Sequence, residues 1–201
     1  MPRPLDLMSL LGSRICHDLI SPLGAIGNGV ELLAMSGTAA GPEMSLISES
    51  VENANARIRF FRVAYGAASE GQTLGGGEVA EILAGLGRSA RTTIQWQVEG
   101  PVPRRAAKLA FLCLQCLESA LPWGGRITVD AAGGAWVIAA EAGKTRDIAH
   151  LWRLFSGAEP GGDLAAADIQ FALAPLWAAE AGFSLRLTEA PEHLRIYFAE
   201  G

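Results

Sequence analysis

The sequence predicts an α+β protein in which an N-terminal antiparallel helical hairpin is followed by an α/β sandwich. Three observations support this prediction. Apolar residues recur at steps of three and four along two long segments, which is the period of an amphipathic helix. A polar, glycine-rich stretch follows at residues 67–77, as expected at a domain junction. Beyond it, shorter runs with helical and strand periods are interspersed, which is typical of helices packed on one face of a largely antiparallel sheet.

The hairpin is predicted from two apolar stripes and the break between them. The first helix is expected from about Leu5 to Ser36, and the second from Pro42 to about Tyr65, because proline suits a first helical turn. The first stripe comprises Met8, Leu11, Ile15, Leu19, Leu23, Ile26, Val30 and Leu33. The second comprises Met44, Ile47, Val51, Ala54, Ile58, Phe61 and Tyr65. Both stripes are too wide to cover each other, so we expect two copies to form a dimeric four-helix bundle, which makes the protein a homodimer.

The remaining elements follow from shorter patterns. Residues 1–70 are assigned to the dimerisation hairpin and residues 71–201 to the sandwich. Further helices are expected at residues 78–88, 104–121, 145–155 and 163–181. Strands are expected at residues 92–99, 126–131, 135–141, 183–188 and 193–199. Gly133-Gly134 and Pro191 indicate the turns of two β-hairpins. The run Gly75-Gly76-Gly77 is interpreted as a flexible joint rather than a phosphate-binding loop.

Composition narrows the possible partners. A net charge of −5 with only 16 Lys and Arg residues argues against nucleic acid, which requires a basic stripe. No apolar stretch reaches the roughly 18 residues of a membrane span, and no signal-peptide pattern precedes the first helix. We therefore expect a cytoplasmic protein with no membrane partner. Cys113 and Cys116 lie in an apolar helical run without a second pair, so we interpret them as core cysteines and expect no metal site.

The first helix carries a candidate nucleophile. Polar and small residues share the face opposite the apolar stripe: Ser13, Arg14, His17, Ser21, Gly24, Asn28 and Glu31. We therefore expect His17 to face solvent, where a neutral imidazole can accept a phosphoryl group near pH 7. Asp18 could orient or deprotonate the imidazole, and Arg14 could meet the phosphoryl charge. A partner protein is expected to dock on Ser13, Ser21, Gly24, Ala25 and Asn28, joined by Arg59 and Arg62 of the second helix.

The segment around this histidine resembles the phosphoacceptor box of sensor histidine kinases. The string His17-Asp18-Leu19-Ile20-Ser21-Pro22-Leu23 matches the pattern His-acidic-x-x-x-Pro-Leu. Proline inside a helix costs roughly 3 kcal/mol, so Pro22 within an apolar stripe favours the resemblance over chance. The order of elements after Gly77 is similar to the ATP-binding domain that follows the hairpin in those kinases.

The ATP motifs of the kinases are missing from the second part of the chain. Ser119 stands where the kinases have an asparagine that holds magnesium, and Glu141-Ala142-Gly143 stands in place of the adenine-binding Asp-x-Gly-x-Gly. Residues 163–168 replace the glycine-rich lid. A kinase hairpin with a degenerate ATPase-like domain is similar to the ChpT-type histidine phosphotransferases of bacterial phosphorelays.

This resemblance implies a function without ATP binding. His17 would pass a phosphoryl group between the aspartates of two receiver domains, those of a hybrid histidine kinase and of response regulators. The chain would need no cofactor of its own, since the receiver would supply Mg²⁺, and its second domain would serve partner docking. Two alternatives remain open. A divergent histidine kinase would use Glu141 and Ser119 as nucleotide ligands, and a non-catalytic pseudokinase would bind kinases or receivers without phosphorylation of His17.

Overall fold

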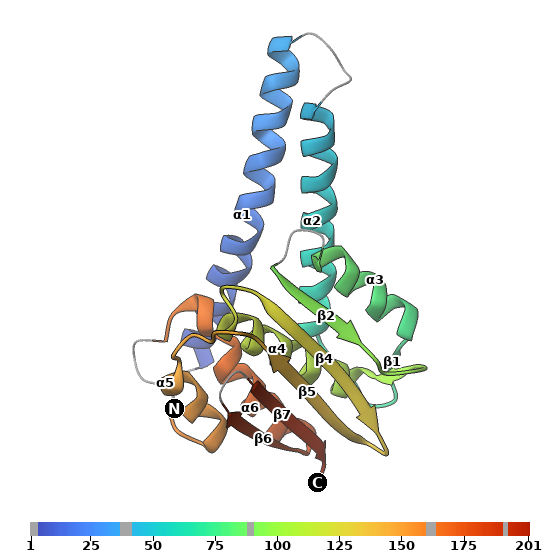
Figure 1. The fold of residues 1–201 in the computed structure, drawn as a ribbon, viewed down its shortest axis with the longest axis vertical. Coiled ribbons are helices and arrows are strands. Elements are labelled where there is room, and N and C mark those ends of the chain that lie inside the picture. The colour runs from blue at the N-terminus through green and yellow to red at the C-terminus, as the bar shows by residue number, and fades with distance from the viewer. Residues whose placement is uncertain (1–3, 37–41, 88–90, 160–163, 191–192) are drawn as a thin grey trace.

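The hairpin projects from a sandwich of helices on a sheet (Figure 1). The computed structural model describes residues 4–36, 42–87, 91–159, 164–190 and 193–201. Helices α1 (Pro4–Ser36) and α2 (Pro42–Ala64) agree with the predicted hairpin to within one residue at the described ends. The predicted break at residues 37–41 lies outside the described residues. None of the helices within the described ranges is long and apolar enough to cross a membrane.

A close contact joins the two helices of the hairpin. A Cβ atom built on Gly29 of α1 would lie 2.5 Å from Cγ1 of Ile47 on α2, so a larger residue at this position would require the Ile47 side chain to shift. Pro22 lies inside the same helix, seven residues before Gly29. Because proline has no N–H, the carbonyl of Asp18, four residues earlier, lacks its usual intrahelical donor. The hydrogen-bond ladder of α1 is therefore interrupted beside His17.

The main sheet has five strands in the order β2-β4-β5-β7-β6. These strands are β2 (Thr92–Trp96), β4 (Gly125–Ala132), β5 (Ala135–Glu141), β6 (Phe183–Ala190) and β7 (His193–Glu200). Only the β2–β4 pair is parallel, which confirms the predicted largely antiparallel sheet. Gly133 and Gly134 join β4 to β5 with φ angles of 57° and 83°, as a two-residue hairpin turn requires. The predicted turn at Pro191 lies outside the described residues.

Helices α4 (Arg104–Ala120) and α6 (Gln170–Ala181) lie behind the sheet in Figure 1, whereas α3 (Gly76–Gly87) lies beside α2. A small sheet pairs β1 (Thr73–Leu74) with β3 (Val102–Pro103). Positions 109–117 of α4 are all buried, and both predicted core cysteines are among them. The same core includes Phe60 and Phe61 of α2. The predicted domain border between residues 70 and 71 thus falls in a loop, but one hydrophobic core contains residues from both sides of this border.

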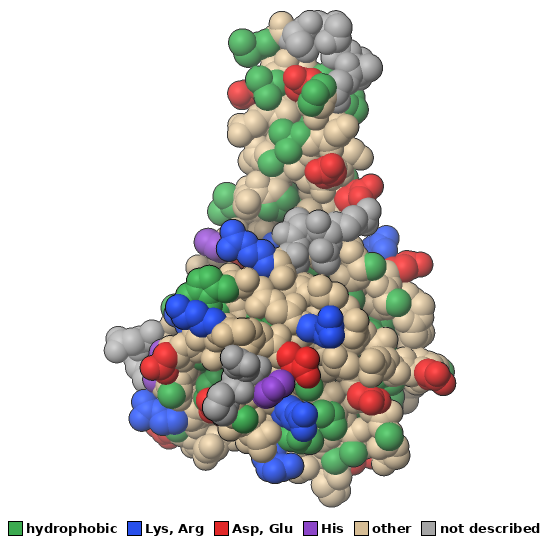
Figure 2. Space-filling view, viewed as in Figure 1, with side chains coloured by type: hydrophobic (Ala, Val, Ile, Leu, Met, Phe, Trp, Pro, Cys, Tyr) green, Lys and Arg blue, Asp and Glu red, His purple; other side chains and the backbone are tan. Residues whose placement is uncertain are grey.

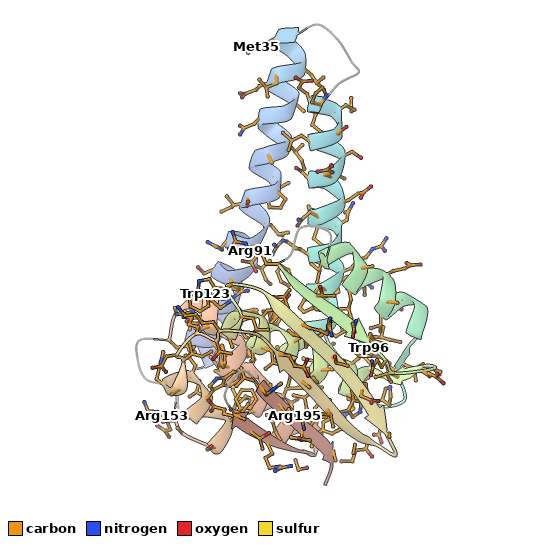
Figure 3. All side chains as sticks on the ribbon, viewed as in Figure 1. Met35, Arg91, Trp96, Trp123, Arg153 and Arg195 are labelled. Atoms are coloured by element: carbon orange, nitrogen blue, oxygen red, sulfur yellow. The ribbon has the colours of Figure 1, made fainter. Side chains whose placement is uncertain are left out.

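The opposite face of the sheet carries polar side chains. Arg195 of β7 is exposed there (Figure 3), and the neighbouring Arg186 of β6 lies 4.6 Å from the centroid of the Tyr197 ring. Alternation of buried and exposed residues along β7 matches one covered and one open face. The helices therefore cover one face of this sheet, as predicted.

Four predicted elements differ from the structure. Gly76 and Gly77 begin α3 instead of forming a flexible joint, because the backbone at Gly76 packs against the carbonyl of Gly100, 3.0 Å from where a Cβ would lie.

The helix predicted at residues 145–155 is shorter in the structure. It consists of α5 (Ala149–Trp152) and a 3₁₀ turn (Arg153–Ser156). The carboxylate of Asp147 accepts a hydrogen bond from the N–H of Ala149 and so sets the start of α5. Helix α6 begins at Gln170, after a 3₁₀ turn, η2 (Ala166–Asp168), because Ala165 is extended. Strand β2 ends at Trp96, three residues earlier than predicted.

Candidate functional site

His17 presents its imidazole to solvent on the N-terminal half of α1. Its side chain is 83% exposed, as the helical spacing predicts. Nδ1 lies 3.1 Å from Oδ1 of Asp18. A carboxylate can only accept a hydrogen bond, so this contact selects the tautomer with hydrogen on Nδ1. The lone pair is then on Nε2, which makes the exposed nitrogen the nucleophilic one.

Asp18 is held between arginines from both helices of the hairpin. Its side chain is 11% exposed, and Oδ2 accepts a hydrogen bond of 2.7 Å from Nε of Arg14. Nη1 of Arg57, on α2, lies 3.8 Å from the same oxygen. Two positive charges on one oxygen leave the other oxygen, Oδ1, directed at His17. Asp18 is therefore fixed in the position from which it can orient the imidazole.

Arg14 does not share the exposed face with His17. Its side chain is only 17% exposed, and its Nη1 donates to the carbonyl of Ala167 and lies 3.5 Å from Oε1 of Gln170. Residues three apart on a helix are separated by about 60° around the axis, and the second domain lies on the side toward which Arg14 turns. The prediction of a shared face is wrong for Arg14, while its role in meeting a phosphoryl charge stays a prediction.

A chain of hydrogen bonds connects this arginine with the centre of the second domain. Nε2 of the buried Gln170 donates to Oγ of Ser119 at 2.9 Å, and this hydroxyl donates to the carbonyl of Gln115 at 3.0 Å. The resemblance to sensor histidine kinases places Ser119 at their magnesium-binding position. In this structure its hydroxyl forms hydrogen bonds within the protein. The side chain of Gln115 in turn accepts from the hydroxyl of Tyr65 at 2.7 Å.

Sequence reasoning missed two charged residues beside Asp18. Arg57 and Glu118 line a cavity of about 120 Å³ that Arg14 and Asp18 also line. Burial raises the pKa of Glu118 to about 7, and the charge of Asp18 adds to this, whereas Arg57 and Arg14 lower it. A signal was present for Arg57, because it lies three residues after Ala54 and four before Phe61, and both are members of the second apolar stripe. An arginine in an apolar stripe needs an acidic partner.

The predicted docking residues divide into three groups. Ser13, Gly24 and Asn28 are exposed on the face of His17. Ser21 and Ala25 line a groove of about 590 Å³, which is completed by Pro22, Glu49, Ser50, Glu52, Asn53, Arg57 and Gly85. Arg59 and Arg62 are exposed on other sides of α2 than Arg57, because two and five residues correspond to turns of about 200° and 140°. Arg59 lies 3.8 Å from Glu81 of α3, so the structure does not bring it to His17.

The remaining positions of the kinase motifs carry other contacts. Glu141 is exposed at the end of β5, where Oε1 lies 4.0 Å from Nδ1 of His193. Residues 164–168 include η2, whose Ala167 carbonyl accepts from Arg14. Asp163 lies outside the described residues.

Comparisons with known proteins identify the family of this chain. Residues 76–193 match the family described as the histidine phosphotransferase C-terminal domain. Protein phosphotransferase ChpT of Brucella abortus (strain 2308) is 35% identical over 202 residues, which span 98% of this chain and 96% of that protein. A 1.7 Å structure of a bacterial phosphotransferase matches with a TM-score of 0.80 and 32% identity over 98% of each chain. The chain belongs to the ChpT-type histidine phosphotransferases.

Proposed function

We propose that this protein passes phosphoryl groups between receiver-domain aspartates through His17, without using ATP. The observation that carries the proposal is the exposed imidazole whose Nδ1 lies 3.1 Å from a carboxylate that two arginines hold in place. This geometry leaves Nε2 free for attack. The membership in a phosphotransferase family supports the same reaction.

The proposed step begins with attack of the Nε2 lone pair on the phosphorus of a receiver's aspartyl phosphate. A P–N bond forms, the P–O bond to the aspartate breaks, and the aspartate leaves as a carboxylate. The imidazole ring gains positive charge, which the carboxylate of Asp18 offsets through the proton on Nδ1. Delivery to a second receiver is the reverse of this step. The Mg²⁺ that neutralises the phosphoryl oxygens is proposed to belong to the receiver.

Three hydrogen bonds support transfer without ATP. The hydroxyl of Ser119 bonds to Gln170 and Gln115, and the Ala167 carbonyl bonds to Arg14. Groups at the positions of kinase nucleotide ligands therefore join the second domain to α1. A divergent kinase predicts that MgATP raises the melting temperature of the protein. The phosphotransferase proposal predicts an unchanged melting temperature.

The receiver is proposed to dock along α1 and the adjoining groove. Gly24, one of several small residues near His17, would let another protein lie close to the helix, and Ser21 and Ala25 line the groove of about 590 Å³ between the helices. The second domain adjoins this region through η2, so it can take part in partner docking.

A homodimer is proposed from the apolar surface of the hairpin. Figure 2 shows hydrophobic side chains along the projecting helices. Among the described residues, the large hydrophobic side chains that are exposed on the hairpin are Met8, Ile20, Leu23, Val30, Leu32 and Met35 of α1 and Met44, Leu46, Val51 and Ile58 of α2. Apolar surface on this scale is typical of an interface, and a second hairpin would bury it in a four-helix bundle.

The direct test follows the phosphoryl group from a receiver to this protein. A receiver domain carrying ³²P on its aspartate is mixed with wild type, with His17→Ala and with His193→Ala, which removes another exposed histidine. We expect label on wild type and on His193→Ala, but none on His17→Ala. Receiver binding without label on wild type would instead support the pseudokinase, and label on His17→Ala would overturn the proposal.

A further inference from the structure

Glu118 places a carboxyl group in the cavity beneath the proposed phosphoacceptor. This residue lies in the last turn of α4, in the second domain, and it is partly buried. Glu118 lines a cavity of about 120 Å³. Asp18 and the two arginines that hold it line the same cavity. Asp18 in turn contacts the imidazole of His17. Glu118 thus shares its electrostatic surroundings with the group that orients the nucleophile.

The charges in this cavity come from three helices. Helix α1 contributes Arg14 and Asp18, α2 contributes Arg57, and α4 contributes Glu118. Helix α3 contributes the apolar Leu86, and the other lining residues are Phe60, Phe61 and Gln115. With Glu118 ionised, two positive and two negative charges cancel. With Glu118 protonated, the cluster carries one net positive charge beside the imidazole.

We propose that Glu118 is a positioning residue for phosphotransfer, whose ionised carboxylate shares Arg14 and Arg57 with Asp18. Asp18 then keeps more of its negative charge for the Nδ1–H of His17. This inference rests on the proposed function of His17 as the nucleophile. Because the ring becomes positive when phosphorylated, a neutral cluster stabilises that state better than a positive one.

The proposal gives the transfer reaction a pH dependence. Burial, with the charge of Asp18, raises the pKa of Glu118 to about 7 against the effects of Arg57 and Arg14. Above pH 7 the carboxylate is ionised and the cluster is neutral, which favours phosphorylation of His17. Below pH 7 the carboxyl is protonated and transfer slows. Acid also protonates imidazoles in general, which removes the nucleophilic lone pair, so the experiment must separate the carboxyl group from the nucleophile.

The substitution Glu118→Gln separates them, since glutamine has the shape of a protonated glutamic acid. Phosphoramidate serves as the probe, because it can donate directly to imidazole without a receiver. We measure the rate of phosphohistidine formation from pH 6 to 8.5 in wild type, Glu118→Gln and Glu180→Gln, a control that removes an exposed carboxylate from α6. The ratio of wild-type to Glu118→Gln rates cancels the pH effects that both proteins share.

We expect this ratio to rise from about one at pH 6 to roughly three- to tenfold above pH 8, given one charge at cavity distance. The ratio for Glu180→Gln should stay near one throughout. A merely structural role for Glu118 would give a ratio that does not change with pH, and that result would overturn the inference. Failure of wild type to accept phosphoryl from a receiver would instead overturn the proposed function.

A second measurement needs no variant. The ring carbons and nitrogens of His17 can be followed by NMR against pH, and the chain has only two other histidines to assign. We expect the His17 resonances of wild type to respond to the ionisation of Glu118 near pH 7, and this response to disappear in Glu118→Gln. The same pH dependence of the His17 resonances in both proteins would contradict a coupling between Glu118 and His17.

Discussion

The contact between Asp18 and His17 determines which nitrogen of the imidazole is exposed. Replacing Asp18 with asparagine keeps the shape of the side chain but removes the negative charge beside Nδ1 of His17. We expect the substitution Asp18→Asn to slow phosphoryl transfer by roughly 100-fold, within the range of general acid–base effects. This rate is measured by mixing the protein with a labelled phosphorylated receiver and quenching the reaction at successive times.

The matched control for this prediction is Glu31→Gln, which removes an exposed acid from the same helix. It should leave the rate within about twofold of wild type, since exposed charges are screened. An Asp18→Asn protein that transfers at the wild-type rate would show that the carboxylate does not assist His17.

Glu118 also makes a prediction for stability. Its pKa is raised from 4.5 to about 7 in the folded protein, so the carboxyl binds its proton more tightly folded than unfolded. The contribution of this group to the free energy of unfolding is fully present below pH 4.5 and is lost as the pH rises through about 7. Glu118→Gln should therefore raise the free energy of unfolding at pH 8 by up to about 3 kcal/mol. At pH 4.5 or below the difference from wild type should be small.

Urea denaturation of both proteins at pH 4.5 and pH 8 measures these differences. If Glu118→Gln were less stable than wild type at pH 8, the ionised carboxylate would be stabilising the fold, contrary to its raised pKa.

At the residue scale, the sequence locates His17 and Asp18 because a local motif contains both. Arg57 and Glu118 are harder to find, because they reach Asp18 from α2 and α4, across 39 and 100 positions of the chain. Arg14 illustrates a different limit. Helical spacing places it near the face of His17, but packing of the second domain against α1 turns its guanidinium toward Ala167.

At the element scale, the contact between α1 and α2 depends on Gly29. Alanine in a helix interior is normally favoured over glycine by about 1 kcal/mol. In Gly29→Ala this gain should be offset or exceeded, because the new Cβ would lie 2.5 Å from Ile47. Gly27→Ala is the control, since nothing lies within 4 Å of its new Cβ.

Thermal unfolding compares the two variants. We expect Gly27→Ala to raise the melting temperature and Gly29→Ala to leave it unchanged or lower it. Equal gains in both variants would mean that the hairpin does not require close packing at Gly29.

Apolar periodicity predicts the long elements well and the short ones poorly. The hairpin and α4 have many turns of consistent pattern, so their ends are predicted within one residue. The segments 145–155 and 163–181 also contain apolar residues at helical spacing, but their starts depend on local backbone. Asp147 bonds to the backbone of Ala149, and Ala165 is extended, which leaves shorter helices than periodicity alone indicates.

At the scale of the whole molecule, the exposed apolar surface predicts self-association through the hairpin. Leu23 is 58% exposed on α1, and a charge there would be buried in the proposed four-helix bundle. We expect Leu23→Glu to convert a dimer into a monomer, as measured by sedimentation equilibrium. Leu176→Glu is the control, because Leu176 is 44% exposed but lies on α6 in the second domain. Dissociation by both variants, or by neither, would contradict an interface on the hairpin.

The two parts of the molecule are joined by more than a loop. Phe60 of α2 lies 4.7 Å from Phe111 of α4 between ring centroids, within one core. The glycine-rich stretch that marks the predicted border does not reveal this packing, because it arises between residues distant in sequence. The same junction connects His17, through Asp18 and Arg14, with Gln170 and Ser119.

The proposed function requires His17 to receive its phosphoryl group from a receiver and not from ATP. To test this, the protein is mixed with radiolabelled MgATP alone and, separately, with a receiver domain carrying labelled phosphoaspartate. We predict label on the protein only in the second mixture. Label from MgATP alone would overturn the proposed function, since the second domain would then act as a kinase.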